Sequence, residues 1–577
     1  MHAKDSISVT DVIRYLTGLL QGDCLVLLLF ILCINPMSYL LNKNCEGYQI
    51  GPPGERLTKI TNLLFVDDLK TYSSSRESAM KQLELITEFT NDIGMKFGED
   101  KCAYMYVEKG QRKELKNTIT MNGLNLNELK SEDSYKYLGM DEDISYRGEI
   151  NKERAKKEYF RRVKKIWRSE LYSKNKVTAH NIFATPIFTL TFGVLNWTKE
   201  EIHQIDVQTR KTLTFTGNFH RNSSVDRLYM LRPDGGRGLN SIYDIYVTRM
   251  IALHKHLQEA AVKNRYIELV LSHEQNGLIR VANAFMEALG ITGNNDNISA
   301  ETKNTIKKQH KEAYEEKSQH GYIHRQQTAS EGYNKKLTNK WLNNPNMISH
   351  TEGYITAIQE QEIYTRALKA KREHPDDASY NKKCRFCNSK TEDIFHLLGS
   401  CNFLSASMYL PMRHDEVGRE VYNAIIHHHY PDERYTLPQT IWKRTDLEIW
   451  WDMLIPTTPP VKHNRPDMVV WNNQDKTCTI VDICVPLDIN VHVQEKTKCD
   501  TYAPLIVGLL RHYPEFKFNI VPLVVGATGL VTNSLVTYLK TLLSNEAEVE
   551  RTAAKMQQKA LIGSMRILKS ALSMRSI

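Results

Sequence analysis

The chain has 577 residues, of which 41% are hydrophobic and 25% charged, and its formal net charge is +9. This length allows roughly three to five domains, and the hydrophobic content permits real cores. Ten cysteines are spread along the chain with only one closely spaced pair. That distribution argues against a disulfide framework and indicates a reducing compartment. The first residues show no signal-peptide pattern.

The first patterned segment is an apolar run over residues 25–34, which follows the polar residues Gln21 and Asp23. A run of about ten residues is short for a membrane span. We therefore expect a buried helix here and no membrane partner.

Two adjacent carboxylates, Asp67 and Asp68, lie between apolar runs. Residues 61–65 and 69–72 are predicted strands, so the two acids would form the tip of a tight hairpin. Neighbouring carboxylates are costly unless a cation neutralises them, and Mg²⁺ is held by such groups together with substrate phosphates. The pattern predicts a polymerase-type magnesium site. The alternative is a plain surface turn, in which Asp is common.

Residues 76–98 have apolar side chains at a helical spacing, at Met80, Leu83, Ile86, Phe89 and Ile93. We expect this helix to pack against the hairpin. Residues 103–127 are predicted to form short strands with a turn at 122–123.

Several short motifs occur in a fixed order along this part of the chain. They are a Gln-Gly-Asp turn at 21–23, the double Asp, a Gly-Met-Lys-Phe segment at 94–97 and a Tyr-Leu-Gly turn at 137–139. This order resembles the palm of reverse transcriptases from non-LTR retrotransposons over about residues 14–240.

The resemblance implies that Gln21 and Gly22 hold the template and incoming nucleotide, and that Asp67 and Asp68 bind Mg²⁺. It also implies an RNA template, a DNA target, deoxynucleoside triphosphates as substrates, and a nuclear location. The family uses a third palm carboxylate and a fingers subdomain before the Gln-Gly-Asp turn, and neither is found here. We therefore expect an N-terminally truncated or decayed copy, or an incomplete gene model, and we leave open whether this chain alone acts as a polymerase.

Residues 151–176 carry eleven Lys and Arg residues against three Glu, with Tyr159, Phe160, Trp167 and Tyr172 interleaved. Such a segment suits a nucleic-acid backbone with stacked bases, and a solvated helix face is the alternative. The candidate contacts are Lys164, Lys165 and Arg168. Arg237, in a glycine-rich turn, is a further candidate for a phosphate contact.

A metal-binding spacing follows residues 263–380, which we interpret as a largely helical linker. Within it, residues 290–345 are rich in polar side chains and are expected to be a linker or solvated helices. Cys384, Cys387, His396 and Cys401 form a Cys-x2-Cys-x8-His-x4-Cys pattern. Two thiolates two residues apart can hold one ion, and His and Cys complete a tetrahedron. Four ligands predict a structural Zn²⁺, and chance spacing of buried thiols is the alternative.

Two acids lie in a second strand-rich region near the C-terminus. Asp467 precedes an apolar strand, and Asp482 lies inside the next one, where a carboxylate is costly unless paired or metal-bound. With Lys498 and Tyr502 on the following helix, they resemble the restriction-like endonuclease of the same retrotransposon group. The implied role is a Mg²⁺-dependent attack of water on a phosphodiester. Lys496 is the alternative lysine.

Structural roles are the alternative for both acids: a turn or helix cap for Asp467 and a satisfied buried carboxylate for Asp482.

The sequence thus predicts a multidomain protein of α/β and α class. The expected parts are a partial reverse-transcriptase palm (α+β, 1–145), a helical thumb (146–262), the linker (263–380), a small zinc knuckle (381–405) and a restriction-endonuclease-like α/β domain with C-terminal helices (406–577). The expected function is a fragment of a polymerase and endonuclease used in target-primed reverse transcription. A catalytically inactive nucleic-acid-binding remnant is the alternative, so enzymatic activity is left open.

Overall fold

The computed structural model describes residues 25–51, 57–96, 98, 101–115, 119–121, 124–130, 133–142, 148–273, 277–293 and 297–573. The chain divides into two compact units. The first comprises residues 1–155, 193–196 and 250–284, and the second comprises 156–192, 197–249 and 285–577. The turn predicted at 122–123 lies outside the described residues.

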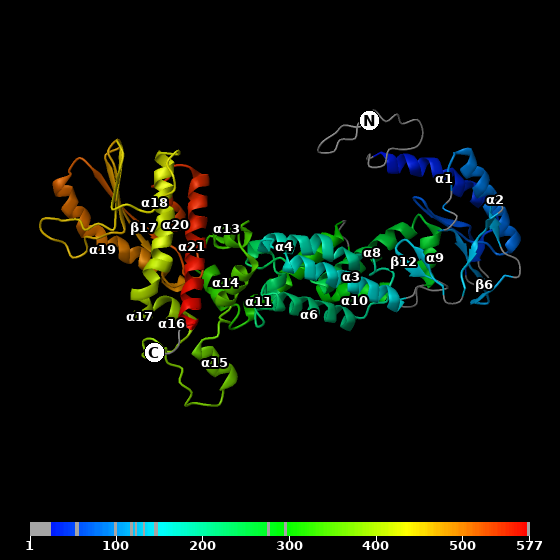
Figure 1. Cartoon of the computed structure of the whole chain (residues 1–577), viewed down its shortest axis with the longest axis horizontal. Coiled ribbons are helices and arrows are strands. Elements are labelled where there is room, and N and C mark those ends of the chain that lie inside the picture. The colour runs from blue at the N-terminus through cyan, green and yellow to red at the C-terminus, as the bar shows by residue number, and fades with distance from the viewer. Residues whose placement is uncertain are drawn as a thin grey trace. The chain divides into compact units, whose positions relative to one another are not determined.

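The N-terminal part of the first unit, up to residue 142, contains two helices and several short hairpins among its described residues (Figure 1). The helices are α1 (Val26–Asn44) and α2 (Arg76–Asp92), with strands β1 (Tyr48–Ile50), β2 (Thr58–Ile60), β3 (Asn62–Phe65), β4 (Asp68–Thr71), β5 (Ala103–Tyr104), β6 (Tyr106–Glu108), β7 (Gln111–Lys113), β8 (Thr120–Met121), β9 (Leu124–Asn125), β10 (Asn127–Glu128), β11 (Tyr135–Tyr137) and β12 (Met140–Glu142). The strands form two-stranded sheets, paired as β1–β2, β3–β4, β5–β10, β6–β7, β8–β9 and β11–β12.

The helix expected at 76–98 is confirmed as α2, although it ends at Asp92. Ser75 caps its start by accepting a hydrogen bond from the backbone N–H of Ser78 (3.1 Å). Ile86 is buried in a cluster that Leu64 of β3 and Leu69 of β4 also join. The helix therefore packs against the hairpin that carries the two acids, as the sequence predicts.

The apolar run at 25–34 is helical but is not buried as predicted. It forms the first half of α1, where Leu27, Leu28 and Leu32 are each more than half exposed. The buried residues of α1 are Ile34, Met37 and Leu41, spaced to face α2. By length and composition α1 could cross a membrane, a test that core helices and signal sequences also pass, and 17% of its apolar window is buried.

The described residues of 148–373 are largely helical. The elements are α3 (Gly148–Arg168), α4 (Ser173–Ala179), η2 (His180–Ala184), α5 (Pro186–Thr189), α6 (Lys199–Phe215), α7 (Val225–Tyr229), η3 (Arg232–Asp234), α8 (Ile242–Ala261), α9 (Arg265–His273), α10 (Leu278–Leu289), α11 (Ile298–Glu316), α12 (Tyr322–Thr328), α13 (Lys335–Thr338), η4 (Lys340–Asn343), α14 (Ser349–Gln359) and α15 (Arg366–Glu373).

The segment expected to be a solvated linker contributes to the core of the second unit. Tyr314, Trp341 and Ile355 are almost fully buried. Trp341 and Ile355 belong to a hydrophobic cluster that also includes Leu561 and Leu568, near the C-terminus. Although the segment is polar overall, it contains a few widely spaced apolar residues. These residues are enough to pack its helices into the core.

The C-terminal part of the second unit is built on a five-stranded sheet in the order β13-β14-β15-β16-β17. Its strands are β13 (Ile441–Lys443), β14 (Leu447–Trp451), β15 (Met468–Asn472), β16 (Thr477–Cys484) and β17 (Lys517–Val524). Only the β16–β17 pair is parallel, and the remaining pairs are antiparallel. The helices of this part are α16 (Ile394–Gly399), α17 (Asn402–Leu404), η5 (Ser405–His414), α18 (Asp415–His429), η6 (Asp488–Asn490), α19 (Val491–His512), α20 (Asn533–Lys540) and α21 (Glu546–Ser573).

Helices cover both faces of this sheet because alternate strand residues are apolar on each side. Val470 and Val481 join one cluster with residues of α18, α20 and α21. Val469 and Ile480 join another cluster with residues of α19. Figure 1 shows the same arrangement, with α19 on one side of the sheet and α18, α20 and α21 on the other. The expected mixture of α/β and helical parts is confirmed.

Candidate metal and nucleic-acid sites

The double Asp lies on a tight hairpin, one residue out of the predicted register. Phe65 pairs with Asp68, so the two-residue turn consists of Val66 and Asp67, and Asp68 opens β4. Val66 adopts a positive φ of 57°, which the tight turn imposes. Both carboxylates are exposed. Exposed acids next to each other remain chemically suited to Mg²⁺.

The hairpin lies beside the Tyr-Leu-Gly turn that joins β11 to β12. Lys70 of β4 forms an ion pair with Glu142 of β12 (2.5 Å), and its ammonium lies 5.2 Å from the ring centroid of Tyr137. Burial, with a further contribution from the negative charge of Asp68, raises the pKa of Tyr137. The structure therefore brings the double Asp, which the resemblance assigns to Mg²⁺, close to the Tyr-Leu-Gly turn, another motif of the same resemblance.

Two features of the predicted palm are not seen here. Gln21 and Gly22 lie outside the described residues. Among the described residues, β3 and β4 pair only with each other and do not join a larger palm sheet.

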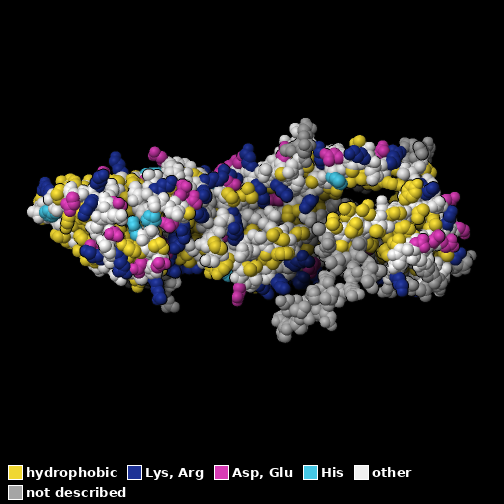
Figure 2. Space-filling view, turned by 90° about the horizontal axis from the view of Figure 1, so that it is seen from above, with side chains coloured by type: hydrophobic (Ala, Val, Ile, Leu, Met, Phe, Trp, Pro, Cys, Tyr) yellow, Lys and Arg dark blue, Asp and Glu magenta, His cyan; other side chains and the backbone are white. Residues whose placement is uncertain are grey.

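The basic helix α3 separates into an exposed charged face and a buried aromatic face. Lys164, Lys165 and Arg168 are exposed, as a nucleic-acid contact requires. Tyr159 and Trp167 are 0% and 1% exposed, so the expectation that they stack on bases is wrong. On the face shown in Figure 2, Lys and Arg side chains are scattered among Asp and Glu side chains rather than gathered in one patch.

Arg237 is a buried structural residue, so the prediction that it contacts a phosphate is wrong. Its side chain is 1% exposed, and its Nε lies 2.7 Å from Oε1 of the buried Glu352. Burial alone would raise the pKa of Glu352, but Arg237 and Arg232 hold it below its usual value. The glycine-rich turn allows the close backbone packing that precedes Arg237. A Cβ on Gly236 would lie 2.3 Å from the carbonyl oxygen of Met230, which is too close.

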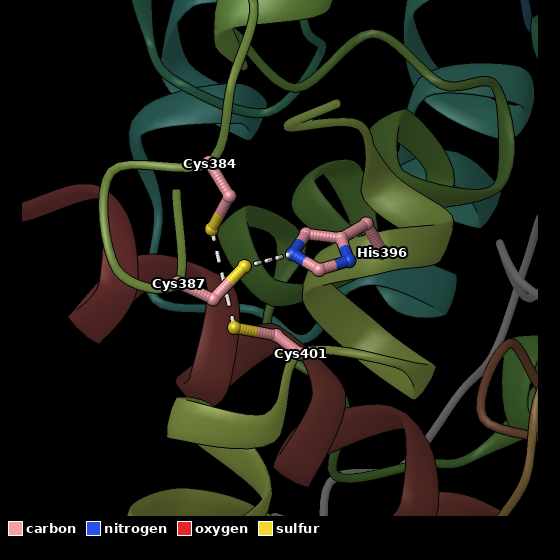
Figure 3. Close-up of side chains that lie close together, drawn as sticks. All are labelled: Cys384, Cys387, His396 and Cys401. Carbon is pink, nitrogen blue, oxygen red and sulfur yellow. Dashed lines mark hydrogen bonds between the residues drawn. The ribbon is translucent and has the colours of Figure 1, made fainter. Parts of the chain in front are cut away.

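The four predicted zinc ligands converge on one point (Figure 3). Their ligand atoms all lie within 4.8 Å of one another, with 3.9 Å between the sulfurs of Cys384 and Cys401 and 3.2 Å from Cys387 Sγ to His396 Nε2. Zn–S bonds of about 2.3 Å at a tetrahedral angle would separate two sulfurs by about 3.8 Å. The donor set and its spacing therefore fit a four-coordinate Zn²⁺.

Neighbouring groups orient these ligands. Ser400 lies 3.2 Å from Nδ1 of His396, which leaves Nε2 for an ion. Burial acts to raise the pKa of Cys387, but hydrogen bonds from Ser389 and nearby backbone bring it down to about 6. Cys384 and Cys401 are fully buried and belong to the same cluster as Leu568 of α21. The cluster is thus part of a core and not a freely mobile finger.

The second pair of acids is brought together by strand pairing. Met468 of β15 pairs with Val481 of β16, so Asp467 comes opposite Asp482 at the end of the ladder. Oδ2 of Asp467 accepts a hydrogen bond from the backbone N–H of Ile483 (2.6 Å). Burial, together with the negative charge of Asp467, raises the pKa of Asp482. Two carboxylates in this arrangement have the chemistry of a divalent-cation site.

The lysine of this site is Lys498 rather than Lys496. Its Nζ lies 2.7 Å from Oδ2 of Asp482, whereas Lys496, two residues earlier on α19, is exposed. Burial acts to lower the pKa of Lys498, but the ion pair with Asp482 raises it overall. The amine therefore stays cationic at neutral pH.

Tyr502 lies inside this site and not on an open surface. Its side chain is 6% exposed, and its hydroxyl lies 3.3 Å from the carbonyl oxygen of Arg465. Burial, reinforced by the charge of Asp482, raises its pKa. The predicted contact with nucleic acid does not agree with this burial.

The sequence analysis missed one residue of the site, His414. Its Nε2 lies 3.1 Å from Oδ2 of Asp467, and its Nδ1 lies 3.0 Å from Oδ1 of Asp415. Burial would lower the pKa of His414, but the two carboxylates raise it to about 10. It is 53 residues away from Asp467 in the chain, and the only local signal is a His-Asp pair after the Cys/His segment.

The exposed double Asp beside the Tyr-Leu-Gly turn is chemically suited to bind a divalent cation. Residues 9–141 match the family model for reverse transcriptase (RNA-dependent DNA polymerase). This part of the chain is a reverse-transcriptase domain, a class that acts on an RNA template with nucleotide substrates and typically uses Mg²⁺. The match covers less than a quarter of the chain. A search of curated proteins found none that matches this chain.

Proposed function

We propose that this chain combines its reverse-transcriptase domain with a metal-dependent DNA endonuclease, as proteins of non-LTR retrotransposons do. The observation that carries this proposal is the convergence of Asp467, Asp482 and Lys498 at one end of the β15–β16 pair. Two acids can hold Mg²⁺ for phosphodiester hydrolysis, and a nearby lysine can stabilise the negative charge that develops.

Each group of this site has a separate task in the proposed reaction. Asp467 and Asp482 would hold Mg²⁺, which supplies Lewis-acid stabilisation of the charge that develops on the phosphodiester. Lys498 is held by Asp482 and stays cationic, so it can face the same developing charge. Asp482 is only 2% exposed, so its interactions are screened less by solvent than those of a surface carboxylate.

The Cys/His cluster would hold a structural Zn²⁺. Four protein ligands leave no open position for a substrate, so the ion would stabilise the fold and not take part in the reaction. Because Cys384 and Cys401 share a core with α21, the ion would fix the helix that covers the nuclease sheet.

The palm hairpin would serve the polymerase half. Asp67 and Asp68 would bind Mg²⁺ beside an RNA template and deoxynucleoside triphosphates, and the proposed DNA target would supply the primer end. A nuclear location follows from this proposal, since the target is chromosomal. The polymerase half of the proposal rests on the family match at residues 9–141.

A nicking assay tests the endonuclease. Supercoiled plasmid and Mg²⁺ would be incubated with the wild-type chain, with Asp482→Asn and with the control Asp432→Asn, which changes an exposed acid outside the site. We expect nicking by the wild type and the control and none by Asp482→Asn. Equal nicking by all three would show contamination, and nicking by none would reject the endonuclease.

A second candidate function is nucleic-acid binding without catalysis. The observation that favours it is the exposed set of Lys164, Lys165 and Arg168, which can bind phosphates without any metal. Salt-dependent DNA binding by a well-folded chain that does not nick would support this candidate.

A further inference from the structure

His414 is placed on the proposed nuclease site by a segment that arrives from the Cys/His cluster. The chain leaves Cys401, passes through α17 and the π-helical η5, and ends η5 at His414. There Nε2 of the imidazole lies 3.1 Å from both Oδ2 of Asp467 and the carbonyl oxygen of Ile483. A carbonyl oxygen can only accept, so Nε2 carries the proton and donates.

This donor fixes one oxygen of Asp467. Oδ2 accepts from two groups, His414 Nε2 and the backbone N–H of Ile483 (2.6 Å). Among the described residues, no hydrogen bond to Oδ1 is found. With Oδ2 held from two directions, the carboxylate cannot rotate freely, and Oδ1 is the atom left for a cation.

The segment that carries His414 is itself held at two points. The hydroxyl of Tyr409 donates to the carbonyl oxygen of Leu397 in α16 (2.8 Å), next to the ligand His396. Arg413 lies 3.3 Å from the hydroxyl of Ser564 in α21. Gly563 allows this contact, because a Cβ there would lie 2.8 Å from Cα of Arg413. The imidazole is therefore fixed by packing and does not reach the site on a flexible loop.

We propose that His414 is a positioning residue of the proposed endonuclease, which donates from Nε2 to Asp467 and orients that carboxylate toward the divalent cation. The inference rests on the proposed function, because it assigns a role within the same site. A purely structural histidine is the competing explanation. The two differ in one respect: a positioning residue affects metal binding at Asp467, while a structural one affects only the stability of the fold.

The test compares two substitutions at this position in the full chain. His414→Phe keeps a ring but removes the donor, and His414→Gln restores an N–H donor at a similar reach. Both would be made in an Asp67→Asn, Asp68→Asn background, so that the palm acids do not contribute. Mn²⁺ binding would be measured by titration calorimetry, with Asp467→Asn to identify the site. The Mg²⁺ dependence of nicking would be measured in parallel.

We expect His414→Phe to weaken Mn²⁺ binding by about 10- to 100-fold, the usual effect of losing a group that orients a metal ligand. The Mg²⁺ concentration for half-maximal nicking should rise by a similar factor, while the rate at saturating Mg²⁺ changes little. His414→Gln should restore both constants to within a few-fold. If His414→Phe fails to fold, His414→Met removes the donor with a flexible side chain.

Two results would overturn the proposal while the endonuclease stands. One is Mn²⁺ binding by His414→Phe within twofold of the wild type. The other is equal loss in His414→Gln and His414→Phe, which would exclude a donor role. If the wild type neither nicks nor binds Mn²⁺ at a site lost in Asp467→Asn, the endonuclease itself is rejected, and the role of His414 with it.

Discussion

Lys498 forms an ion pair with Asp482 across 2.7 Å, and the carboxylate of Asp482 is only 2% exposed. A buried carboxylate without a partner is strongly unfavourable, so the lysine stabilises the fold before any ligand binds. In the proposed endonuclease the same charge would face the scissile phosphate. Lys498 therefore has a structural role and a proposed catalytic role, and the two can be separated by experiment.

Lys498→Met should lower the free energy of unfolding by up to about 3 kcal/mol. This is the lower end of the range for breaking a buried ion pair, and it applies because Lys498 is partly exposed. Chemical denaturation measures this change. Nicking should be lost at temperatures where the variant is still folded. Lys496→Met is the matched control on the same helix, and it should leave stability and nicking unchanged. A folded Lys498→Met that nicks at the wild-type rate would contradict the assignment.

Zinc should be required for the stability of the second unit. The purified chain should contain one zinc ion per molecule, and Cys401→Ser should lose it and lower Tm by several degrees, because Cys401 lies in the core that includes α21. Cys33→Ser is the control, since this thiol is exposed and outside the cluster. Metal analysis and thermal unfolding measure both effects. A metal-free wild type with the same Tm would exclude a structural zinc site.

Local patterns predicted the strands around Asp467 and Asp482 and the helix that carries Lys498. These patterns, apolar runs and helical spacing, involve only residues that are close together in the sequence. The Cys/His cluster could be predicted equally well from the sequence, because the types of the ligands and their spacing are local features. His414 was not, because its contact with Asp467 exists only after η5 has packed on α21. Such a long-range pair leaves no periodic signal.

Burial was the property least accessible from the sequence. Tyr159 and Trp167 were expected to face nucleic acid, but they lie on the inner face of α3, and their hydroxyl and ring N–H find partners in Thr209 and His180. The opposite error occurred in α1, where an apolar run proved exposed. Charge and hydrophobicity identify a helix, but neighbouring elements decide which face is covered.

Stability should fall at alkaline pH because of His310. Burial acts to lower its pKa, but Asp226 and Asp244 raise it to about 9, above the ordinary value near 6.5. The charged imidazole therefore stabilises the fold fully below about pH 6.5, and this contribution is lost as the pH rises through about 9. Unfolding free energies at pH 6 and pH 10 should differ by on the order of 2 kcal/mol more in the wild type than in His310→Gln. Identical pH dependence in the two proteins would exclude this linkage.

Arg237 and the exposed cations of α3 should affect different properties. Arg237→Ala leaves Arg232 as the remaining described charged partner of the buried Glu352, so the unfolding free energy should fall by about 3 kcal/mol while nucleic-acid affinity stays the same.

The triple variant with Gln at positions 164, 165 and 168 should keep its stability and weaken DNA binding. If all three cations contact phosphates, the slope of log K against log salt should decrease by about 2.7 for duplex DNA. Unchanged binding by the triple variant would place the nucleic-acid surface elsewhere, and weakened binding by a stable Arg237→Ala would restore the phosphate role that its burial excludes.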